Sequence, residues 1–262
     1  MALSIDLKGK TVLVTGGISG IGLGTATMFA QAGAQVIACA ELSADADLVK
    51  RYHEEMKRYT DHASYYKVDV TNTADIQALA DELASKFGKL DVLVSNAGQN
   101  VFETVEHCDQ SAWNLNQQLN LESHWQVGKH MKRLLDQADN GVLIVMTSNH
   151  AYASMKGCFP YNVAKAALLA MVRAMALEWA PSIRTVGIAP GFVDTPGNQK
   201  WFDSFDDPEQ ARADTVDLHP VKRLGTPTEI GAWCVFLASE YAAFANGTTY
   251  LIDGGRSASM QD

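Results

Sequence analysis

Short apolar runs rich in β-branched residues alternate with longer stretches of helical periodicity along almost the whole chain. Runs that are apolar nearly throughout are typical of strands covered on both faces in a parallel sheet. Seven runs fit this description: Thr11–Val14, Gln35–Cys39, Ser64–Val68, Asp91–Val94, Val142–Val145, Thr185–Ile188 and Thr249–Ile252. Because no linker or repeat interrupts the alternation, we expect one doubly wound α/β domain over residues 1–262, with a seven-stranded parallel sheet.

Helices are expected between these strands. The clearest is 73–87, where one apolar stripe is preceded by Thr73 as a possible N-cap and followed by Gly88. Further helices are predicted over Trp113–Leu135, Tyr161–Trp179 and Glu229–Ala238. The segment 191–220 is rich in Asp, Pro and Gly yet contains Trp201, so we expect a substrate-covering loop there.

Charge and composition exclude several classes of protein. The net charge of −9 over 262 residues argues against a nucleic-acid partner, which needs a basic face. No apolar run is long enough to span a membrane, and the N-terminus does not look like a signal peptide. The four cysteines lack CxxC spacing, so neither a metal site nor a disulfide is expected. A reduced, cytoplasmic protein is the resulting expectation.

A glycine-rich stretch, Thr15-Gly-Gly-Ile-Ser-Gly-Ile-Gly22, joins the first strand to the next helix. Glycines at such a junction allow a tight turn and let a pyrophosphate approach the N-terminus of the helix. A turn needed only for close helix packing is the alternative.

Tyr161 and Lys165 stand four residues apart at the start of a predicted helix. That spacing places both side chains on one face. A phenol has a pKa near 10 and is a poor base at neutral pH, and a nearby cation lowers that pKa. The pair therefore suits proton transfer, although such pairs also occur on ordinary helix faces.

Taken together, these motifs resemble the short-chain dehydrogenase/reductase family, which binds NAD or NADP on a Rossmann-like fold. The resemblance rests on the T-G-x-x-x-G-x-G spacing and on six further features in order along the chain: Ser95-Asn-Ala-Gly98, Asn120, Ser148, Tyr161-x-x-x-Lys165, Pro190-Gly191 and Asp253-Gly-Gly255. It implies that Tyr161 is the catalytic acid/base, that Lys165 also binds the nicotinamide ribose, that Ser148 holds the substrate oxygen, and that Asn120 holds a water. It also implies a homotetramer with interfaces at Tyr161–Trp179 and 253–262.

The resemblance also implies a set of cofactor contacts. Asp69 would accept from the adenine amine, unless it only caps a local turn, and Thr195 would reach the nicotinamide carboxamide. The full set is Gly16, Ile18, Ser19, Gly20, Ile21, Gly22, Glu41, Asp69, Val70, Asn96, Ala97, Gly98, Tyr161, Lys165, Pro190, Gly191, Val193 and Thr195.

The choice between NAD and NADP depends on the end of the second strand. Ala40 stands where the family usually has an acid, and Glu41 follows it. A carboxylate at 41 would repel a 2′-phosphate, and Ser19 stands where NADP-binding members carry a base. NAD is therefore favoured, with Glu41 either binding the ribose or standing in solvent.

Residues expected around the substrate are unusually polar. The expected substrate-binding set is Asn100, Ser148, Asn149, His150, Tyr161, Phe192 and Trp201. Amides and an imidazole suit hydroxyl groups, so we expect a polyhydroxylated substrate, an aldose oxidised at C1 or a polyol. His150 could equally be structural. An NADPH-dependent 3-oxoacyl or keto-ester reductase remains an alternative, as does a non-catalytic dinucleotide-binding regulator.

Overall fold

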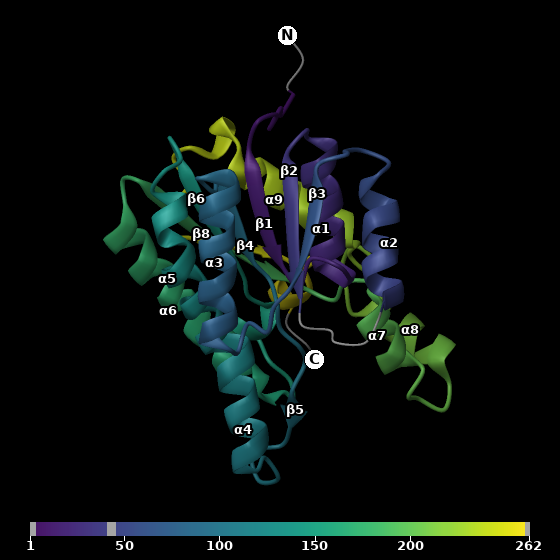
Figure 1. The fold of residues 1–262 in the computed structure, drawn as a ribbon. Coiled ribbons are helices and arrows are strands. Elements are labelled where there is room, and N and C mark those ends of the chain that lie inside the picture. The colour runs from purple at the N-terminus through teal and green to yellow at the C-terminus, as the bar shows by residue number, and fades with distance from the viewer. Residues whose placement is uncertain (1–3, 41–45, 260–262) are drawn as a thin grey trace.

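The computed structural model describes residues 4–40 and 46–259, and its centre is a seven-stranded sheet (Figure 1). Every neighbouring pair of strands is parallel, and the spatial order is β3-β2-β1-β4-β6-β8-β9. The strands are β1 Thr11–Thr15, β2 Gln35–Ala40, β3 Ala63–Lys67, β4 Val92–Ser95, β6 Gly141–Met146, β8 Ile183–Pro190 and β9 Thr249–Ile252. The predicted fold class is confirmed, and all seven predicted runs are strands.

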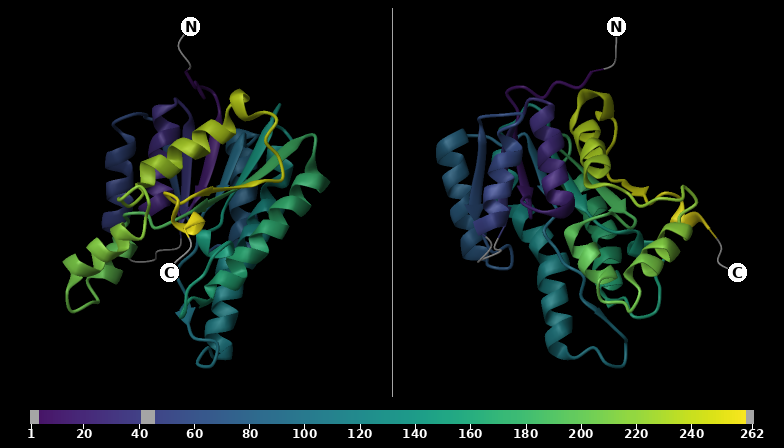
Figure 2. Two further views of the ribbon diagram at one scale, coloured as in Figure 1. Left: turned by 180° about the vertical axis from the view of Figure 1, so that it is seen from behind. Right: turned by 90° about the vertical axis from the view of Figure 1, so that its right-hand side faces the viewer.

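Helices cover both faces of the sheet (Figure 2). They are α1 Gly20–Gln31, α2 Ala46–Met56, α3 Thr73–Phe87, α5 Ser123–Leu135, α6 Tyr161–Trp179 and α9 Pro227–Ala238. Side chains alternate along each strand, so Val12 and Val14 pack toward α1, α2 and α9 whereas Leu13 packs toward α3, α5 and α6. The two apolar cores explain why the strand sequences are apolar almost throughout.

The predicted helix boundaries need three corrections. The predicted helix 113–135 begins earlier, as α4 Gln110–Gln117, and a π-helical turn at Gln118–Glu122 separates it from α5. Helix α9 begins at Pro227, because Thr226 and Glu229 form a capping box. The N-cap of α3 is Asn72 rather than Thr73, because the Asn72 side chain accepts from Ala74 N at 2.9 Å.

The segment 191–220 is mostly helical and not the expected loop. It contains α7 Pro196–Phe202 and α8 Pro208–Asp217, which project beyond the carboxyl edge of the sheet (Figure 1). Each helix has proline in its first turn and a capping side chain just before it, Thr195 for α7 and Asp207 for α8.

A second, two-stranded sheet escaped prediction. Strands β5 Phe102–Glu103 and β7 Phe159–Pro160 pair antiparallel, and each is only two residues long. This pairing brings Phe102 beside the start of α6. Of the helices in the described part of the chain, none is both long and apolar enough to cross a membrane.

Candidate active site

A cavity of about 1470 Å³ lies along the carboxyl ends of the central strands. In a doubly wound sheet, ligands bind at this edge, where the chain crosses from one side of β1 to the other. Its lining includes the predicted residues Gly16, Ser19, Gly20, Ile21, Gly22, Asp69, Val70, Asn96, Ala97, Gly98, Asn100, Ser148, Asn149, His150, Tyr161, Lys165, Pro190, Gly191, Phe192, Val193, Thr195 and Trp201. Residues from distant parts of the sequence thus meet in one space, called the central cavity below.

The glycine loop gives the central cavity one wall. Gly16 has a φ of 64° and donates to Cys39 O at 2.7 Å, which turns the chain sharply after β1. A Cβ on Gly22 would lie 2.0 Å from Gly16 O, so only glycine fits there. Ser19, the N-cap of α1, makes no side-chain capping bond. The helix N-terminus and the free hydroxyl suit a pyrophosphate, so the loop fits a dinucleotide.

The two isoleucines of the loop behave differently. Ile21 lines the central cavity, as expected. Ile18 is 1% exposed and packs in the core beneath α1 and α9, so its predicted contact with the cofactor is not supported. A fully buried side chain stabilises the loop from below and leaves no surface for a ligand.

The end of β4 is fixed to the end of β1. Thr15 Oγ1 accepts from Asn96 N at 2.9 Å and from Ala97 N at 3.0 Å, and Asn96 Nδ2 donates to Thr15 O at 2.9 Å. The Asn96 amide therefore holds the backbone that lines the cavity, which is the position expected for it.

Just after β3, Asp69 caps a local turn and still lines the cavity. Its Oδ1 accepts from Thr71 N at 2.8 Å and from Thr71 Oγ1 at 2.7 Å. The turn-capping role that the sequence left open for Asp69 is thus present, and it uses one of the two carboxylate oxygens. Ala40 also lines the cavity, whereas Glu41 lies outside the described residues.

Ser148, Tyr161 and Lys165 meet at the floor of the central cavity. Ser148 follows β6, and its Oγ accepts from His150 N at 3.2 Å. Tyr161 is the first residue of α6, and its hydroxyl is close enough to Ser148 for that side chain to lower the pKa of the phenol. Lys165, one turn on, is only 3% exposed, lies 5.5 Å from the Tyr161 ring centroid and donates to Met146 O at 3.1 Å. The group has the geometry for proton transfer to an oxygen beside Ser148.

Burial dominates the electrostatics of this floor. It raises the pKa of Tyr161 to about 12, against a lowering contribution from the hydrogen bond with Ser148. Burial also lowers the pKa of Lys165 to about 7, so its amine is only partly charged at neutral pH. The expected lowering of the Tyr161 pKa by Lys165 is therefore not found in this structure. The phenol is the stable form here, and it is the form that donates a proton.

Asn120 lies behind the cavity wall and does not line it. Its Oδ1 accepts from Gln99 N at 3.1 Å, and its Nδ2 donates to Gln99 O and Asn116 Oδ1, both at 2.9 Å. A Cβ on Gly98 would lie 2.8 Å from Asn120 Oδ1 and 3.6 Å from Lys165 Nζ, so the three residues are close neighbours. The π-helical turn carries Asn120, and such turns often occur at functional sites. That Asn120 holds a water stays a prediction.

Aromatic rings form the substrate side of the floor. The rings of Phe102, His150 and Tyr161 lie with centroids 5.4 to 6.0 Å apart. Burial, with the nearby positive charge of Arg256, lowers the pKa of His150, which keeps the imidazole neutral at pH 7. Phe192 and Trp201, which also line the cavity, pack together with ring centroids 5.5 Å apart.

Sequence reasoning missed several lining residues. Phe102 is placed by the short β5–β7 pairing, Cys158 precedes Tyr161 by three residues, and Arg256 and Ser257 follow the glycines after β9. Only the positions of Arg256 and Ser257, directly after the Asp253-Gly-Gly255 motif, offered a signal.

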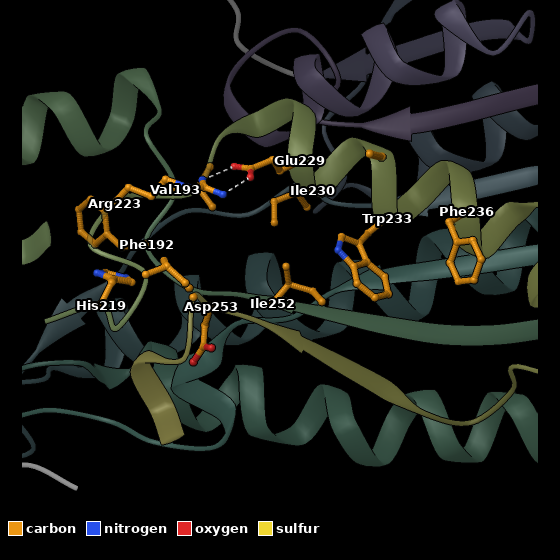
Figure 3. A pocket seen from close by; sticks show the side chains of 15 residues that line it. Phe192, Val193, His219, Arg223, Glu229, Ile230, Trp233, Phe236, Ile252 and Asp253 are labelled. Atoms are coloured by element: carbon orange, nitrogen blue, oxygen red, sulfur yellow. Dashed lines mark hydrogen bonds and ion pairs between the residues drawn. The ribbon is translucent and has the colours of Figure 1, made fainter. Parts of the chain in front are cut away.

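A second cavity, of about 540 Å³, lies between α9, β9 and the segment that follows β8 (Figure 3). Its walls are mostly apolar, with Trp233 and Phe236 from α9 and Ile252 from β9. None of Ser148, Tyr161 and Lys165 lines it. The chemistry therefore belongs to the central cavity, although the second one is the more apolar.

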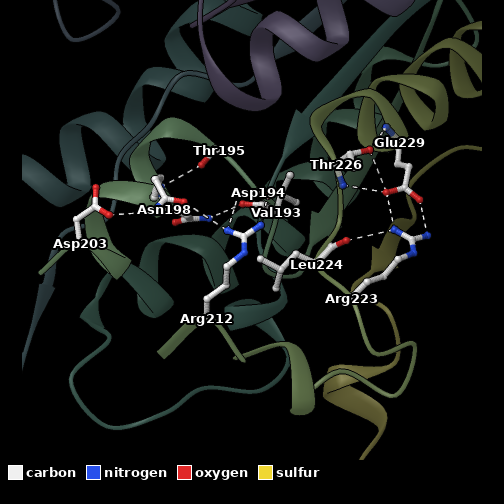
Figure 4. Close-up of polar contacts among 11 residues, drawn as sticks. Val193, Asp194, Thr195, Asn198, Asp203, Arg212, Arg223, Leu224, Thr226 and Glu229 are labelled. Atoms are coloured by element: carbon white, nitrogen blue, oxygen red, sulfur yellow. Dashed lines mark hydrogen bonds and ion pairs between the residues drawn. The ribbon is translucent and has the colours of Figure 1, made fainter. Parts of the chain in front are cut away.

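Polar contacts attach α7 and α8 to the end of β8 (Figure 4). Arg212 on α8 forms an ion pair with Asp194, and Asn198 Nδ2 donates to Val193 O at 2.7 Å. Because Val193 and Thr195 line the central cavity, these contacts position one side of the site. No group of three or more potential metal-ligating side chains occurs among the residues that the structure describes.

Comparison with known proteins agrees with this geometry. Residues 16–257 match a family model described as enoyl-(acyl carrier protein) reductase. The chain is 31% identical to the 3-oxoacyl-(acyl-carrier-protein) reductase of Thermotoga maritima, over 95% of this chain and 98% of that one. The structure of L-sorbose reductase from Gluconobacter frateurii with NADPH and L-sorbose has a TM-score of 0.92 at 28% identity, covering 98% and 100% of the two chains. Aldohexose dehydrogenase from Thermoplasma acidophilum has a TM-score of 0.89 at 26% identity, covering 99% and 98%.

Proposed function

This chain belongs to the short-chain dehydrogenase/reductase family and is an NAD(P)-dependent oxidoreductase, and we propose that it uses NAD to oxidise a polyhydroxylated substrate, an aldose at C1 or a polyol. The observation that carries the proposal is the polar substrate side of the central cavity. Asn100, Asn149 and His150 line it beside Ser148 and Tyr161. Two similar solved structures are named for sugar substrates, L-sorbose and aldohexose, which supports this class.

Each residue of the floor has a separate role in the proposed reaction. A bound nicotinamide supplies the hydride acceptor. The glycine loop and Ser19 hold the pyrophosphate, and Lys165 holds the ribose next to it. Ser148 donates a hydrogen bond to the substrate oxygen, and Tyr161 takes the hydroxyl proton as that oxygen becomes a carbonyl. Because burial raises the pKa of the phenol to about 12, Tyr161 needs added positive charge nearby before it can act as the base.

Replacement of Tyr161 by phenylalanine tests this assignment. Tyr161→Phe removes the proton acceptor and keeps the ring contacts with Phe102 and His150. General acid–base catalysis contributes on the order of 100- to 10,000-fold, so NADH formation at 340 nm should fall about 1000-fold. Binding of NADH, followed by its fluorescence, should stay within about twofold. Turnover close to wild type would remove Tyr161 from the mechanism.

The preference for NAD rests on the charges at the adenine end of the cavity. Of the described residues that line this end, only Asp69 is charged, and no cation is present to attract a 2′-phosphate. Glu41→Arg should replace repulsion by attraction and shift the ratio of kcat/KM for NAD over NADP at least tenfold toward NADP. An unchanged ratio would show that residue 41 does not face the ribose.

A second candidate is an NADPH-dependent 3-oxoacyl or keto-ester reductase. The protonated phenol of Tyr161 is the form that a carbonyl reduction requires, which favours this direction of the reaction. The similarity to the reductase of Thermotoga maritima supports it as well. Consumption of NADPH with a keto-ester, without oxidation of any sugar, would establish this candidate instead.

We also propose a homotetramer. Large apolar side chains are exposed on α6, where Leu177 is 82% exposed, and around α9 and β9, including Phe244 and Leu251. The second cavity opens on the same apolar region of α9 and β9 (Figure 3). Subunit contacts would cover these surfaces. Gel filtration should give four times the chain mass of 28.4 kDa, and elution as a monomer would contradict the proposal.

A further inference from the structure

Two polar atoms in the turn after β9 are buried without a partner. Arg256 Nη1 and Ser257 Oγ are shielded from solvent, and neither has a hydrogen-bond partner in the range 4–40 or 46–259. The Arg256 side chain is only half-buried and lines the central cavity, so its guanidinium is a cationic donor without an acceptor among the described residues. An enzyme that keeps such a donor in its cavity gains most if a ligand supplies the missing acceptor.

The turn itself is held in place by Asp253. The Asp253 carboxylate accepts from Gly255 N at 3.0 Å and from Ser257 N at 2.8 Å. Gly254 and Gly255 have positive φ values of 62° and 83°, which the sharp turn requires. Burial lowers the pKa of Arg256 and the nearby charge of Asp253 raises it, yet the two side chains form no ion pair, so the Asp253 carboxylate bonds the backbone and not the guanidinium.

Arg256 and Ser257 face the substrate side of the central cavity. Both line it together with Ser148 and Tyr161. Arg256 is also close enough to His150 for its charge to lower the pKa of that imidazole. The His150 ring in turn lies 6.0 Å from the Tyr161 ring, so Arg256, His150 and Tyr161 belong to the same part of the cavity lining.

The charge of the cavity differs from that of the protein. The chain carries a net charge of −9. The described residues lining the cavity nevertheless include the cationic side chains Lys156 and Arg256 and the partly charged Lys165, against a single carboxylate, Asp69. A cleft lined by one sign of charge concentrates ligands of the opposite sign. The substrate side therefore favours an anion.

We propose that the polyhydroxylated substrate carries a carboxylate, which binds the guanidinium of Arg256. The inference rests on the proposed oxidation of a polyol and specifies its class as a sugar acid or related hydroxy acid. The planar guanidinium donates two parallel hydrogen bonds to a carboxylate. A single guanidinium beside a neutral imidazole matches one negative charge better than the two charges of a phosphate ester.

A matched set of six-carbon compounds tests the proposal: glucose, sorbitol, gluconate and glucose 6-phosphate. Each is titrated against the enzyme–NADH complex by NADH fluorescence and assayed with NAD at 340 nm. Arg256→Met removes the charge and keeps a side chain of similar length, whereas Arg256→Lys keeps the charge but loses the paired donors of the guanidinium. Arg51→Met is the matched control, because Arg51 is an exposed arginine on α2. Unfolding temperatures of all variants confirm that they fold.

Gluconate should bind wild type at least 100-fold more tightly than sorbitol, and Arg256→Met should weaken only gluconate, by about 100-fold. Arg256→Lys should weaken the binding of gluconate about tenfold, and Arg51→Met should leave it unchanged. Equal binding of gluconate and sorbitol, or gluconate binding that Arg256→Met leaves unchanged, would overturn the inference. Preferential binding of glucose 6-phosphate would overturn the carboxylate assignment in favour of a phosphate.

The two readouts separate this inference from the proposed function. Binding of gluconate that depends on Arg256, without NADH formation on any of the four compounds, would sustain the anion site and count against polyol oxidation. Oxidation of sorbitol as fast as gluconate in wild type and in Arg256→Met would sustain the function and reject the anion site.

Discussion

At the floor of the central cavity, Lys165 donates to the Met146 carbonyl, and directly behind the cavity wall Asn120 bonds both peptide groups of Gln99. On the substrate side of the same cavity, Arg256 and Ser257 end without such a partner among the described residues. Asn120 and Lys165 are thus held from within the protein, whereas the partner that we propose for Arg256 is a ligand.

This difference explains how one fold can serve several substrates. Groups that transfer a proton must be held within a fraction of an ångström, and buried networks with every group paired provide that rigidity. Groups that select a substrate must stay free to bind it. The similar proteins named above share the fold at high TM-scores, yet their names specify L-sorbose in one case and aldohexose in another.

The floor should be the more sensitive of the two regions to a single substitution. Asn120→Leu removes the side-chain partner of both Gln99 backbone groups and of Asn116 Oδ1, while Asn116 Nδ2 still donates to Pro160 O. Unpaired buried groups cost about 1–3 kcal/mol each, so we expect a loss of several kcal/mol in unfolding free energy and about a 100-fold fall in kcat. Urea denaturation and steady-state kinetics measure the two. Asn114→Leu, at an exposed position of α4, is the control. If Asn120→Leu lost no more stability and activity than this control, the expected sensitivity of this region would be contradicted.

The charge state of Lys165 should make the stability of the floor depend on pH. Burial lowers the pKa of Lys165 to about 7 in the folded protein, from an ordinary value near 10.5. Between these values the unfolded chain holds a proton that the folded protein has lost, so the penalty for burying the charge disappears as pH rises and stability increases. Tyr161, with its pKa raised to about 12, contributes only above pH 10.

The measurement is the unfolding free energy of wild type and Lys165→Met from pH 7 to 9. The unfolding free energy of wild type minus that of Lys165→Met should increase by about 1 kcal/mol for each pH unit. Lys50→Met, at an exposed lysine on α2, should show no such slope. Parallel curves for wild type and Lys165→Met would mean that Lys165 stays charged when buried.

The smallest effect is expected where α8 is attached to the end of β8. Arg212→Met breaks the ion pair with Asp194, in which the arginine side chain is 38% exposed and the aspartate side chain 40% exposed. Exposed pairs contribute about 0–1 kcal/mol, so unfolding temperature should hardly change, while KM should rise a few-fold because α7 and α8 position Thr195 and Trp201. Arg133→Met breaks a similar exposed pair with Asp81, away from the cavity, and should leave KM unchanged. A large loss of kcat in Arg212→Met would show that catalysis depends on this segment as strongly as on the floor.

The sequence predicted best what depends on local patterns. Runs such as Val142–Val145 are apolar because strands in a parallel sheet are buried on both faces, so every predicted strand was found. The positions of Ser148, Tyr161 and Lys165 followed from the order of motifs. The helices α7 and α8 were missed although Thr195-Pro196 and Asp207-Pro208 both give a cap followed by proline, a start signal also present at Thr226-Pro227.

Other features had no local signal. The π-helical turn that carries Asn120 and the two-residue strands β5 and β7 depend on contacts between distant segments. Burial of Tyr161 and Lys165, which moves both pKa values away from a charged pair, arises only when α6 packs under the strands. The position of Arg256 directly after Asp253-Gly-Gly255 is a local signal, but its proximity to His150 depends on the packing of distant segments.

The most direct test of the central claim is absorbance at 340 nm with wild-type enzyme, NAD or NADP, and a panel of aldoses, sugar acids, polyols and simple secondary alcohols. We predict NADH formation on one group of polyhydroxylated compounds, with little reaction when NADP replaces NAD. No reaction across that panel, together with NADPH consumption on keto-esters, would contradict both the substrate class and the cofactor preference.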